Sequence, residues 1–378
     1  MSPETARAEL PLLATCVYLN SNSTGAFPRG ARAAAERYYD LLERWRDEAW
    51  EGFLAEMGAH ADEIAALIGA PPASVTLDTS VSSLLGRVLS CFDFQARPRV
   101  VTTDLEFPNV EMLLGAFLRY GCEPVIVKST DGIAIDPHAV AAAMDERTQL
   151  VVVSHATFAT GALTYLAPIV RRARSVGAIV AVDAYQSLGV VPFDVDALDV
   201  DIVFGGAHKW LCGAIDSAFC YVRPSLVAEL VPAATGWMAS KNALSFARST
   251  GLANDARRMS AGTPAPLAAL TSREGLRLVR SVGVERIRAL SVARTERIIA
   301  RADEAGLVVA TPRDSRARAG IVNLRFDRAE EVVQALKGDG FVCSHRAGAR
   351  IAPHFYNTDE EVERFMDALI AYAAKAQT

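Results

Sequence analysis

The 378-residue sequence predicts an α/β protein with a large domain built on a mostly parallel central sheet and a smaller C-terminal α+β domain. Two observations support this prediction. Between residues 75 and 222, short apolar runs rich in Val, Ile and Ala alternate with amphipathic stretches, and such alternation is typical of parallel strands buried on both faces. Beyond residue 260, two long helical patterns precede short strands that are mixed with helices. The expected domains are therefore residues 1–260 and 261–378.

The elements of the large domain can be assigned in order. Residues 28–70 have apolar and charged residues at helical spacing, with Pro28 in the first turn, and predict a helix. Seven apolar runs then predict strands, at 75–77, 99–102, 124–127, 150–153, 178–182, 202–204 and 218–222. The stretches between them predict helices at 80–92, 108–120, 137–145 and 165–176. Residues 232–263 are rich in Ala, Ser, Gly and Arg without a clear period, which predicts irregular structure.

The second domain begins with two long helical patterns, at 264–281 and 283–304. Hydrophobic patterning beyond them predicts strands at 306–310 and 320–326, a helix at 328–338, strands at 340–344 and 349–352, and a last helix from residue 358. Since strands and helices are not in regular alternation here, an α+β arrangement is expected.

Composition excludes several classes of protein. The 44 acidic residues outnumber the 39 Lys and Arg residues, which argues against a nucleic-acid binder. No apolar run approaches the ~18 residues of a membrane helix, and the N-terminus lacks a secretory pattern. The six cysteines are scattered without a C-x-x-C pair, and the six histidines form no H-E-x-x-H pattern. We therefore expect a cytoplasmic protein without a metal site, whose cysteines are mostly small core residues.

Two charged residues directly follow predicted strands. Asp183 ends the strand at 178–182, and ligands of open α/β sheets gather beyond the carboxyl ends of strands. Lys209 lies 26 residues later, after the strand at 202–204, in the glycine-bounded run 205–213. Taken singly, Asp183 could be a structural cap and Lys209 a surface loop lysine. Together they indicate a functional site.

These segments also resemble a known family. Asp183-Ala184-Tyr185-Gln186 followed by His208-Lys209-Trp210 is similar to the signature of class V pyridoxal-phosphate enzymes of fold type I. That group contains cysteine desulfurases, class V aminotransferases, isopenicillin N epimerases and kynureninases. The resemblance extends over nearly the whole chain, through residues 17–25, Glu106-Phe107-Pro108-Asn109, Ser154 with Thr160-Gly161, and residues 350–358.

The resemblance implies pyridoxal 5'-phosphate as cofactor. Lys209 would form the aldimine with it, and Asp183 would keep the pyridine nitrogen protonated. Hydroxyl groups before the helix at 80–92 suit capping, and a helix start offers N–H donors to a phosphate. The family's pattern carries this phosphate role to Ser80 and Val81. Further cofactor contacts are implied for Phe107, which would stack on the ring, and for Ser154, Gln186, His208 and Thr263.

The substrate implied by the resemblance is an α-amino acid that reacts through an external aldimine. Arg350 would bind its carboxylate, since a guanidinium presents a planar fork to two oxygens. Asn22 and Trp237 are the other expected substrate residues. The resemblance further implies a homodimer with the active site at the interface, where Thr263 comes from the neighbouring subunit.

Kynureninase-like motifs favour cleavage at the β-carbon, of either a Cβ–Cγ or a Cβ–heteroatom bond. The alternatives are a class V aminotransferase, then a cysteine desulfurase or C–S lyase, or an epimerase. Three positions depart from kynureninases, which have Tyr at His208, His at Gln186 and Asn near Thr263. Cys343 lies near the region of the desulfurase nucleophile, but in a predicted strand.

Two other classes of function are weighed against these. A dinucleotide-binding oxidoreductase would need a G-x-G-x-x-G after the first strand, which is absent from the sequence. A regulatory protein that keeps the fold without chemistry would not need both Asp183 and Lys209.

Overall fold

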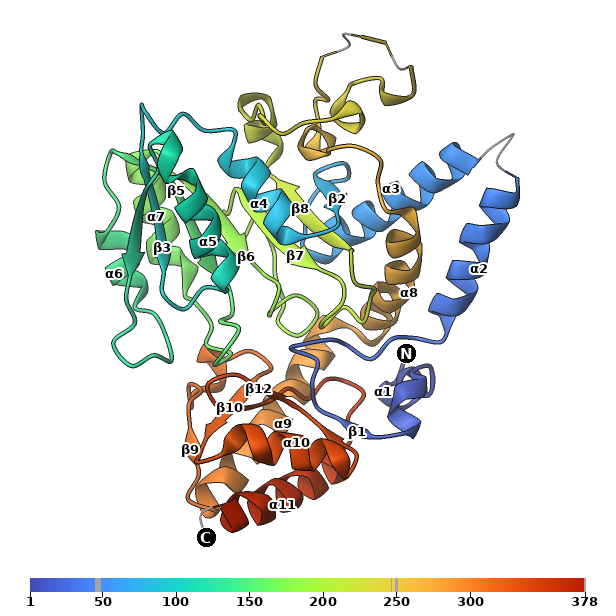
Figure 1. Ribbon diagram of the computed structural model, residues 1–378, viewed down its shortest axis with the longest axis vertical. Helices are drawn as coiled ribbons and strands as arrows, with labels where there is room; N and C mark the ends of the chain where they lie inside the picture. The colour runs from blue at the N-terminus through green and yellow to red at the C-terminus, as the bar shows by residue number, and fades with distance from the viewer. Residues whose placement is uncertain (45–48, 246, 249–250, 377–378) are drawn as a thin grey trace.

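The computed structural model describes residues 1–44, 49–245, 247–248 and 251–376. Its central feature is a seven-stranded sheet with the order β2-β8-β7-β6-β5-β3-β4 (Figure 1). The strands are β2 (Val75–Asp78), β3 (Arg99–Thr103), β4 (Glu123–Val127), β5 (Thr148–Ser154), β6 (Ile179–Asp183), β7 (Ile202–Gly206) and β8 (Ala218–Val222). β8 runs opposite to the other six strands of this sheet, so its pairs with β2 and β7 are antiparallel and the remaining pairs are parallel. The α/β class with a mostly parallel sheet is thus confirmed.

Both faces of this sheet are buried. Along β5, Val151 and Val153 point into one hydrophobic core and Leu150 and Val152 into another, because successive side chains of a strand point to opposite faces. The first core also takes residues from α3, α6, α7 and α8, and the second from α4 and α5. These helices are α3 (Ala49–Leu67), α4 (Val81–Leu89), α5 (Pro108–Phe117), α6 (Pro137–Ala142), α7 (Leu166–Val176) and α8 (Pro266–Val282).

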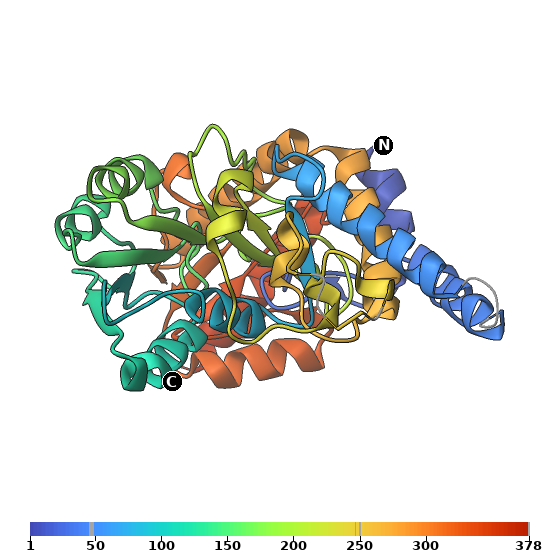
Figure 2. The same ribbon diagram turned by 90° about the horizontal axis from the view of Figure 1, so that it is seen from above.

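The predicted single helix at 28–70 is wrong in one respect. The structure has two helices there, α2 (Gly30–Glu43) and α3, and residues 45–48 between them lie outside the described residues. Arg44 already leaves helical geometry, with φ −97° and ψ 23°. The two helices lie side by side and both pack against α8 (Figures 1 and 2).

A second, four-stranded sheet has the order β12-β13-β10-β9, with all pairs antiparallel. Its strands are β9 (Val308–Val309), β10 (Val322–Arg325), β12 (Ser344–His345) and β13 (Ala349–Ile351), and its helices are α9 (Val284–Glu304), α10 (Ala329–Gly338) and α11 (Asp359–Ala376). The four strands and three helices lie in or near the ranges predicted for the smaller domain. The domain boundary at residue 260 stays a prediction.

The N-terminal segment joins this smaller sheet region. After α1 (Pro3–Ala8) and a short 3-10 turn (Pro11–Ala14), β1 (Val17–Tyr18) pairs in parallel with β11 (Phe341–Val342). An isolated bridge then links Asn20 to Ala352. The following residues are thereby held beside β13.

Residues 224–259 contain only short 3-10 turns in their described part, as the lack of a period predicts. These are Pro224–Glu229, Trp237–Ala239, Ala243–Ser245 and Ala256–Met259; two further turns lie at Leu118–Tyr120 and Ser315–Ala317.

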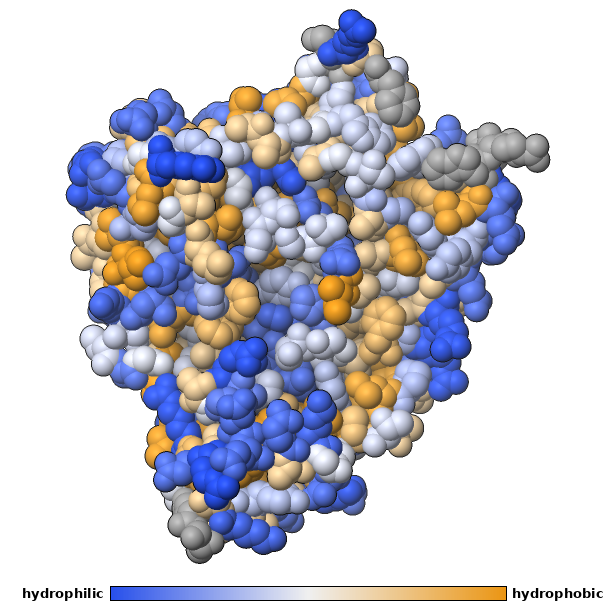
Figure 3. All heavy atoms as spheres, in the orientation of Figure 1, coloured by the Kyte–Doolittle hydropathy of each residue, from blue (hydrophilic) through white to orange (hydrophobic). Residues whose placement is uncertain are grey.

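No helix in the described part of the chain is long and apolar enough to cross a membrane. In the view of Figure 3, hydrophilic residues crowd the lower part of the molecule, over α10 and α11.

Candidate active site

Asp183 and Ser154 lie together at the carboxyl edge of the central sheet. They are register partners at the ends of β6 and β5. Asp183 Oδ1 accepts a hydrogen bond of 2.8 Å from the Tyr185 backbone N–H, and its other oxygen receives none from the residues that the structure describes. Burial raises the pKa of Asp183, although that N–H and the charge of Lys209 oppose the shift. The site therefore presents a carboxylate with one oxygen that accepts no hydrogen bond from the described residues.

Lys209 follows β7 by three residues and faces the same region. Burial lowers the pKa of its amine to about 8; Asp183 opposes this shift and Arg350 adds to it. The amine lies 4.3 Å from the centroid of the Tyr185 ring and 6.0 Å from that of Phe107. An amine with so low a pKa can lose its proton near neutral pH, as a nucleophilic or proton-transferring lysine must.

Backbone atoms of the N-terminal segment contact the loop that carries Lys209. The Gly25 N–H donates to the His208 carbonyl oxygen at 2.7 Å. A Cβ at Gly25 would lie 2.0 Å from the Lys209 carbonyl oxygen. Only glycine allows the two backbones to approach so closely, and this contact fixes the backbone position of Lys209.

Arg350, on β13, is a buried cation without an acidic partner. Its Nη1 donates to the Phe158 carbonyl oxygen at 2.6 Å, and the amide oxygen of Asn22, when oriented toward it, accepts from Nη1 and Nε at 3.2 Å. Within the described ranges no carboxylate lies within 4.0 Å of its guanidinium. Burial, together with Arg346, lowers the pKa of Arg350 to about 10. Because a buried charge is costly unless it is paired, this environment fits a bound carboxylate.

A half-buried glutamate, Glu106, belongs to the site and has no role in the sequence analysis. Its carboxylate accepts hydrogen bonds from Thr103 Oγ1 at 2.7 Å and from Ser154 Oγ at 2.5 Å. Burial raises the pKa of Glu106 to about 7, and Asp183 adds to the shift. The sequence did point to this residue, because Glu106 is the first residue of the 106–109 segment that resembles the family.

The loop before α4 has the predicted helix-start geometry. Ser80 is the N-cap, and its Oγ accepts from the Ser83 N–H at 3.1 Å; Val81 is the first helical residue. A buried ion pair ties this loop to the sheet, because Arg87 Nη1 lies 2.8 Å from Asp78 Oδ2.

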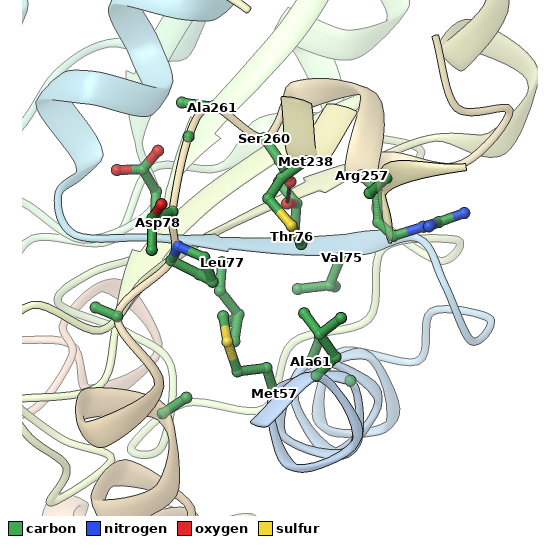
Figure 4. A pocket seen from close by; sticks show the side chains of 18 of the residues that line it. Met57, Ala61, Val75, Thr76, Leu77, Asp78, Met238, Arg257, Ser260 and Ala261 are labelled. Carbon is green, nitrogen blue, oxygen red and sulfur yellow. Dashed lines mark hydrogen bonds between the residues drawn. The ribbon is translucent and has the colours of Figure 1, made fainter. Parts of the chain in front are cut away.

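A cavity of about 980 Å³ opens beside the loop. Met57 and Ala61 of α3, Leu77 of β2 and Met238 line its wall, as Figure 4 shows. Thr263 lines it too, with Asp78 and Thr79 from the loop. Lys209 and Asp183 do not, so this cavity lies next to the lysine site and not around it.

Two predicted site residues, Gln186 and Trp237, contact other side chains, and Cys343, whose role the sequence left open, is buried. Gln186 is buried with its amide engaged, since Oε1 accepts from Trp210 Nε1 at 3.0 Å and Nε2 donates to the Asn22 carbonyl oxygen at 2.9 Å. Trp237 packs edge-on against Trp50, with ring centroids 5.8 Å apart. The roles of Gln186 and Trp237 stay predictions. Cys343 is buried, and burial raises the pKa of its thiol to about 12.

The chain is similar to known proteins over most of its length. The family model described as Aminotransferase class-V matches residues 17–365. The chain belongs to this family.

Its relatives have more than one activity. The chain is 32% identical to the uncharacterized aminotransferase YcbU of Bacillus subtilis (98% of each chain) and 26% identical to the kynureninase of Geobacillus thermodenitrificans (94% of this chain, 88% of the relative). A solved structure of C-DES with glycine covalently linked to its pyridoxal-phosphate cofactor matches with a TM-score of 0.88 at 21% identity, covering 96% of this chain and 98% of that one. The fold is therefore that of fold type I pyridoxal-phosphate enzymes.

Pyridoxal phosphate is accordingly the cofactor of this class-V aminotransferase family member, and the residues present fit it. A lysine of lowered pKa, a carboxylate with one oxygen that accepts no hydrogen bond from the described residues, and a helix N-terminus with an N-cap serine would supply an amine, a ring-nitrogen partner and phosphate donors. Bound here, the cofactor supplies an electron sink for the α-carbon of an amino acid.

Proposed function

We propose that this enzyme acts on an α-amino acid and cleaves a bond at its β-carbon. The observation that carries the proposal of an amino-acid substrate is Arg350, a buried guanidinium that, among the described residues, is held by neutral oxygens and lies close enough to Lys209 to lower the pKa of its amine. Arg350 and Asn22 would hold the α-carboxylate and orient the α-carbon toward Lys209.

Lys209 would then move the proton at the α-carbon. With a pKa of about 8, its amine is present in both protonation states near neutral pH, so it can serve as base and afterwards as acid. Asp183 would hold its negative charge against the cofactor's ring nitrogen. Tyr185 and Phe107 place two aromatic rings near the amine, which limits access of water to it.

Cleavage at the β-carbon is supported by the kynureninase-like segments and by the kynureninase relatives. Phe107 of the 106–109 segment packs edge-on against Phe158, with ring centroids 5.3 Å apart. This aromatic pair joins Phe107 to the residue whose carbonyl oxygen holds Arg350. Transamination is the second candidate, favoured by the match to YcbU over 98% of both chains.

A desulfurase reaction through Cys343 is not favoured. A nucleophilic cysteine needs a thiolate and an accessible sulfur, whereas burial raises the pKa of Cys343 to about 12.

Product analysis with a panel of amino acids tests the proposal. Release of pyruvate, alanine or ammonia without an added keto acid supports cleavage at the β-carbon. Amino transfer that requires a keto acid would replace it with transamination. Lys209→Ala, which removes the reacting amine, is the negative control for both reactions.

We also propose that the enzyme works as a homodimer. The cavity beside the loop before α4, the proposed phosphate-binding loop, has an apolar wall of Leu54, Met57, Leu77 and Leu244. Thr263 lines the same cavity. A second copy seated there would cover this wall and bring Thr263 to the partner's cofactor. Light scattering on the purified enzyme should give a dimer; a monomer that turns over substrate would contradict this.

A further inference from the structure

Tyr185 contacts both residues of the His208-Lys209 pair from a neighbouring strand end. Its ring centroid lies 4.3 Å from Lys209 Nζ, and its hydroxyl oxygen lies 2.9 Å from His208 Nδ1. Gln186, the residue of the same segment to which the sequence analysis gave a cofactor role, is engaged in the core. Tyr185 thus contacts His208 and Lys209 with its side chain, whereas the Gln186 side chain contacts the next residue, Trp210.

The backbone of β7 leaves space for this ring. A Cβ at Gly206, the last residue of β7, would lie 2.0 Å from Tyr185 Oη and 2.2 Å from its Cζ. All three of the nearest atoms that such a Cβ would meet belong to Tyr185. The absence of a side chain at Gly206 is therefore matched to the position of the Tyr185 ring.

The charge states allow the Tyr185 hydroxyl to be the donor of this hydrogen bond. Burial raises the pKa of Tyr185, with contributions from Asp183 and Asp216. Burial and the charge of Lys209 lower the pKa of His208 to about 4, although Asp216 opposes the shift. Both groups are thus neutral near pH 7. A neutral imidazole has one acceptor nitrogen, and a phenol is a good donor to it.

We propose that Tyr185 is a positioning residue of the cofactor site: its hydroxyl donates to His208 Nδ1 and so keeps the imidazole hydrogen on Nε2, while its ring holds the Lys209 amine in place. An Nε2–H is a donor suited to a phosphate group. The inference rests on the proposed function of this site and on the cofactor contact that the family resemblance implies for His208.

The first experiment removes the hydroxyl alone. Tyr185→Phe should weaken binding of pyridoxal phosphate to the apoenzyme about five-fold, the effect of losing one hydrogen bond of about 1 kcal/mol. The dissociation constant is measured by equilibrium dialysis, which does not depend on turnover. Tyr372→Phe, which removes a surface hydroxyl bonded to Asp339, is the matched control and should bind as the wild type does.

A spectroscopic readout separates positioning from a general structural role. Nitrogen-15 NMR of histidine-labelled apoenzyme distinguishes a protonated from an unprotonated ring nitrogen, and His208→Gln identifies the signals of His208. The wild type should show hydrogen on Nε2 only, and Tyr185→Phe should show both tautomers. A loss of folding stability alone would not change this pattern.

The second experiment tests the ring through Gly206. Gly206→Ala should displace the Tyr185 ring and weaken cofactor binding at least as much as Tyr185→Phe does. In a Tyr185→Ala background the same methyl group has space, so the added change should cost nothing. Thermal unfolding of each variant shows whether it is folded. If the alanine variants do not fold, the comparison of Tyr185→Phe with His208→Gln still tests the inference.

The outcomes are distinct. Non-additive effects of Tyr185→Phe and His208→Gln on the dissociation constant support the inference. Additive effects, or a Tyr185→Phe enzyme with wild-type affinity and tautomer, overturn it while leaving the proposed function standing. A wild-type apoenzyme that bound no pyridoxal phosphate would instead overturn the cofactor site itself, and this role with it.

Discussion

The Ser154 hydroxyl donates a hydrogen bond of 2.5 Å to Oε2 of Glu106, and this contact joins the end of β5 to the loop after β3. Because Ser154 is the register partner of Asp183, two carboxyl groups occupy the same edge of the sheet. Burial raises the pKa of both groups, that of Glu106 to about 7. Two nearby carboxyl groups avoid repulsion when one is protonated, and the raised pKa of Glu106 allows it to hold such a proton near neutral pH.

Glu106 should make stability depend on pH in a defined direction. The folded pKa of about 7 exceeds the unfolded value of about 4.3, so the native state binds the proton more tightly. The free energy of unfolding should therefore fall as pH rises from about 4.5 to 7, by on the order of 3 kcal/mol. Urea unfolding across this pH range should show a smaller change in the free energy of unfolding for Glu106→Gln than for the wild type. Glu111→Gln, at an exposed position, should keep the wild-type slope, and an unchanged slope in Glu106→Gln would contradict the assignment.

Asp183 should matter far more for turnover than for cofactor binding. Its carboxylate would stabilise a protonated ring nitrogen, a charge needed for the electron sink more than for affinity. Asp183→Ala should lower kcat by at least about 100-fold and raise the dissociation constant of pyridoxal phosphate by less than about ten-fold, since oxyanion-type electrostatic groups contribute on this scale. Steady-state kinetics and equilibrium dialysis give the two values. Equal losses in both would contradict the role.

Arg350 should control the Michaelis constant through its shape as well as its charge. Arg350→Lys keeps a positive charge but loses the planar fork, and the KM for the amino acid should rise about 10–100-fold at unchanged cofactor affinity. Arg350→Gln should act similarly and also raise the pKa of Lys209, because Arg350 lowers it in the wild type. The pH dependence of the visible absorbance reports that shift. Arg346→Lys, at an exposed neighbouring arginine, is the control, and a KM unaffected by Arg350→Lys would place the carboxylate elsewhere.

The strands could be predicted because their physical requirements are local. Runs such as 178–182 must be apolar throughout when both faces of the sheet are buried. The helix at 28–70 was mispredicted since α2 and α3 have neither proline nor a strong break in pattern between them. Their separation depends on packing against α8, which is distant in sequence.

The site residues also differ in whether the sequence alone could predict them. Lys209 and Asp183 were accessible because strand ends and family motifs mark them. Glu106 and Tyr185 lay inside recognised segments, but their partners, Ser154 and His208, come from other strands. No sequence spacing reveals such a contact before the strand order is known.

The buried pair Arg87–Asp78 should be a major stabilising element of the loop before α4. Arg87 Nη1 lies 2.8 Å from Asp78 Oδ2 and also donates to the Met259 carbonyl oxygen at 2.6 Å, while Nε donates to that of Ala234 at 3.0 Å. One side chain thus ties β2 and α4 to the irregular segment that leads to Thr263.

Arg87→Met should lower the free energy of unfolding by about 3–5 kcal/mol, because it leaves the Asp78 charge buried without its partner. Adding Asp78→Asn removes that charge and should restore part of the loss. Arg328→Ala breaks an ion pair whose side chains are 57% and 64% exposed and should cost no more than about 1 kcal/mol. Urea denaturation measures all four proteins. A loss in Arg87→Met as small as that in Arg328→Ala would show that water enters this site and that the loop does not depend on the pair.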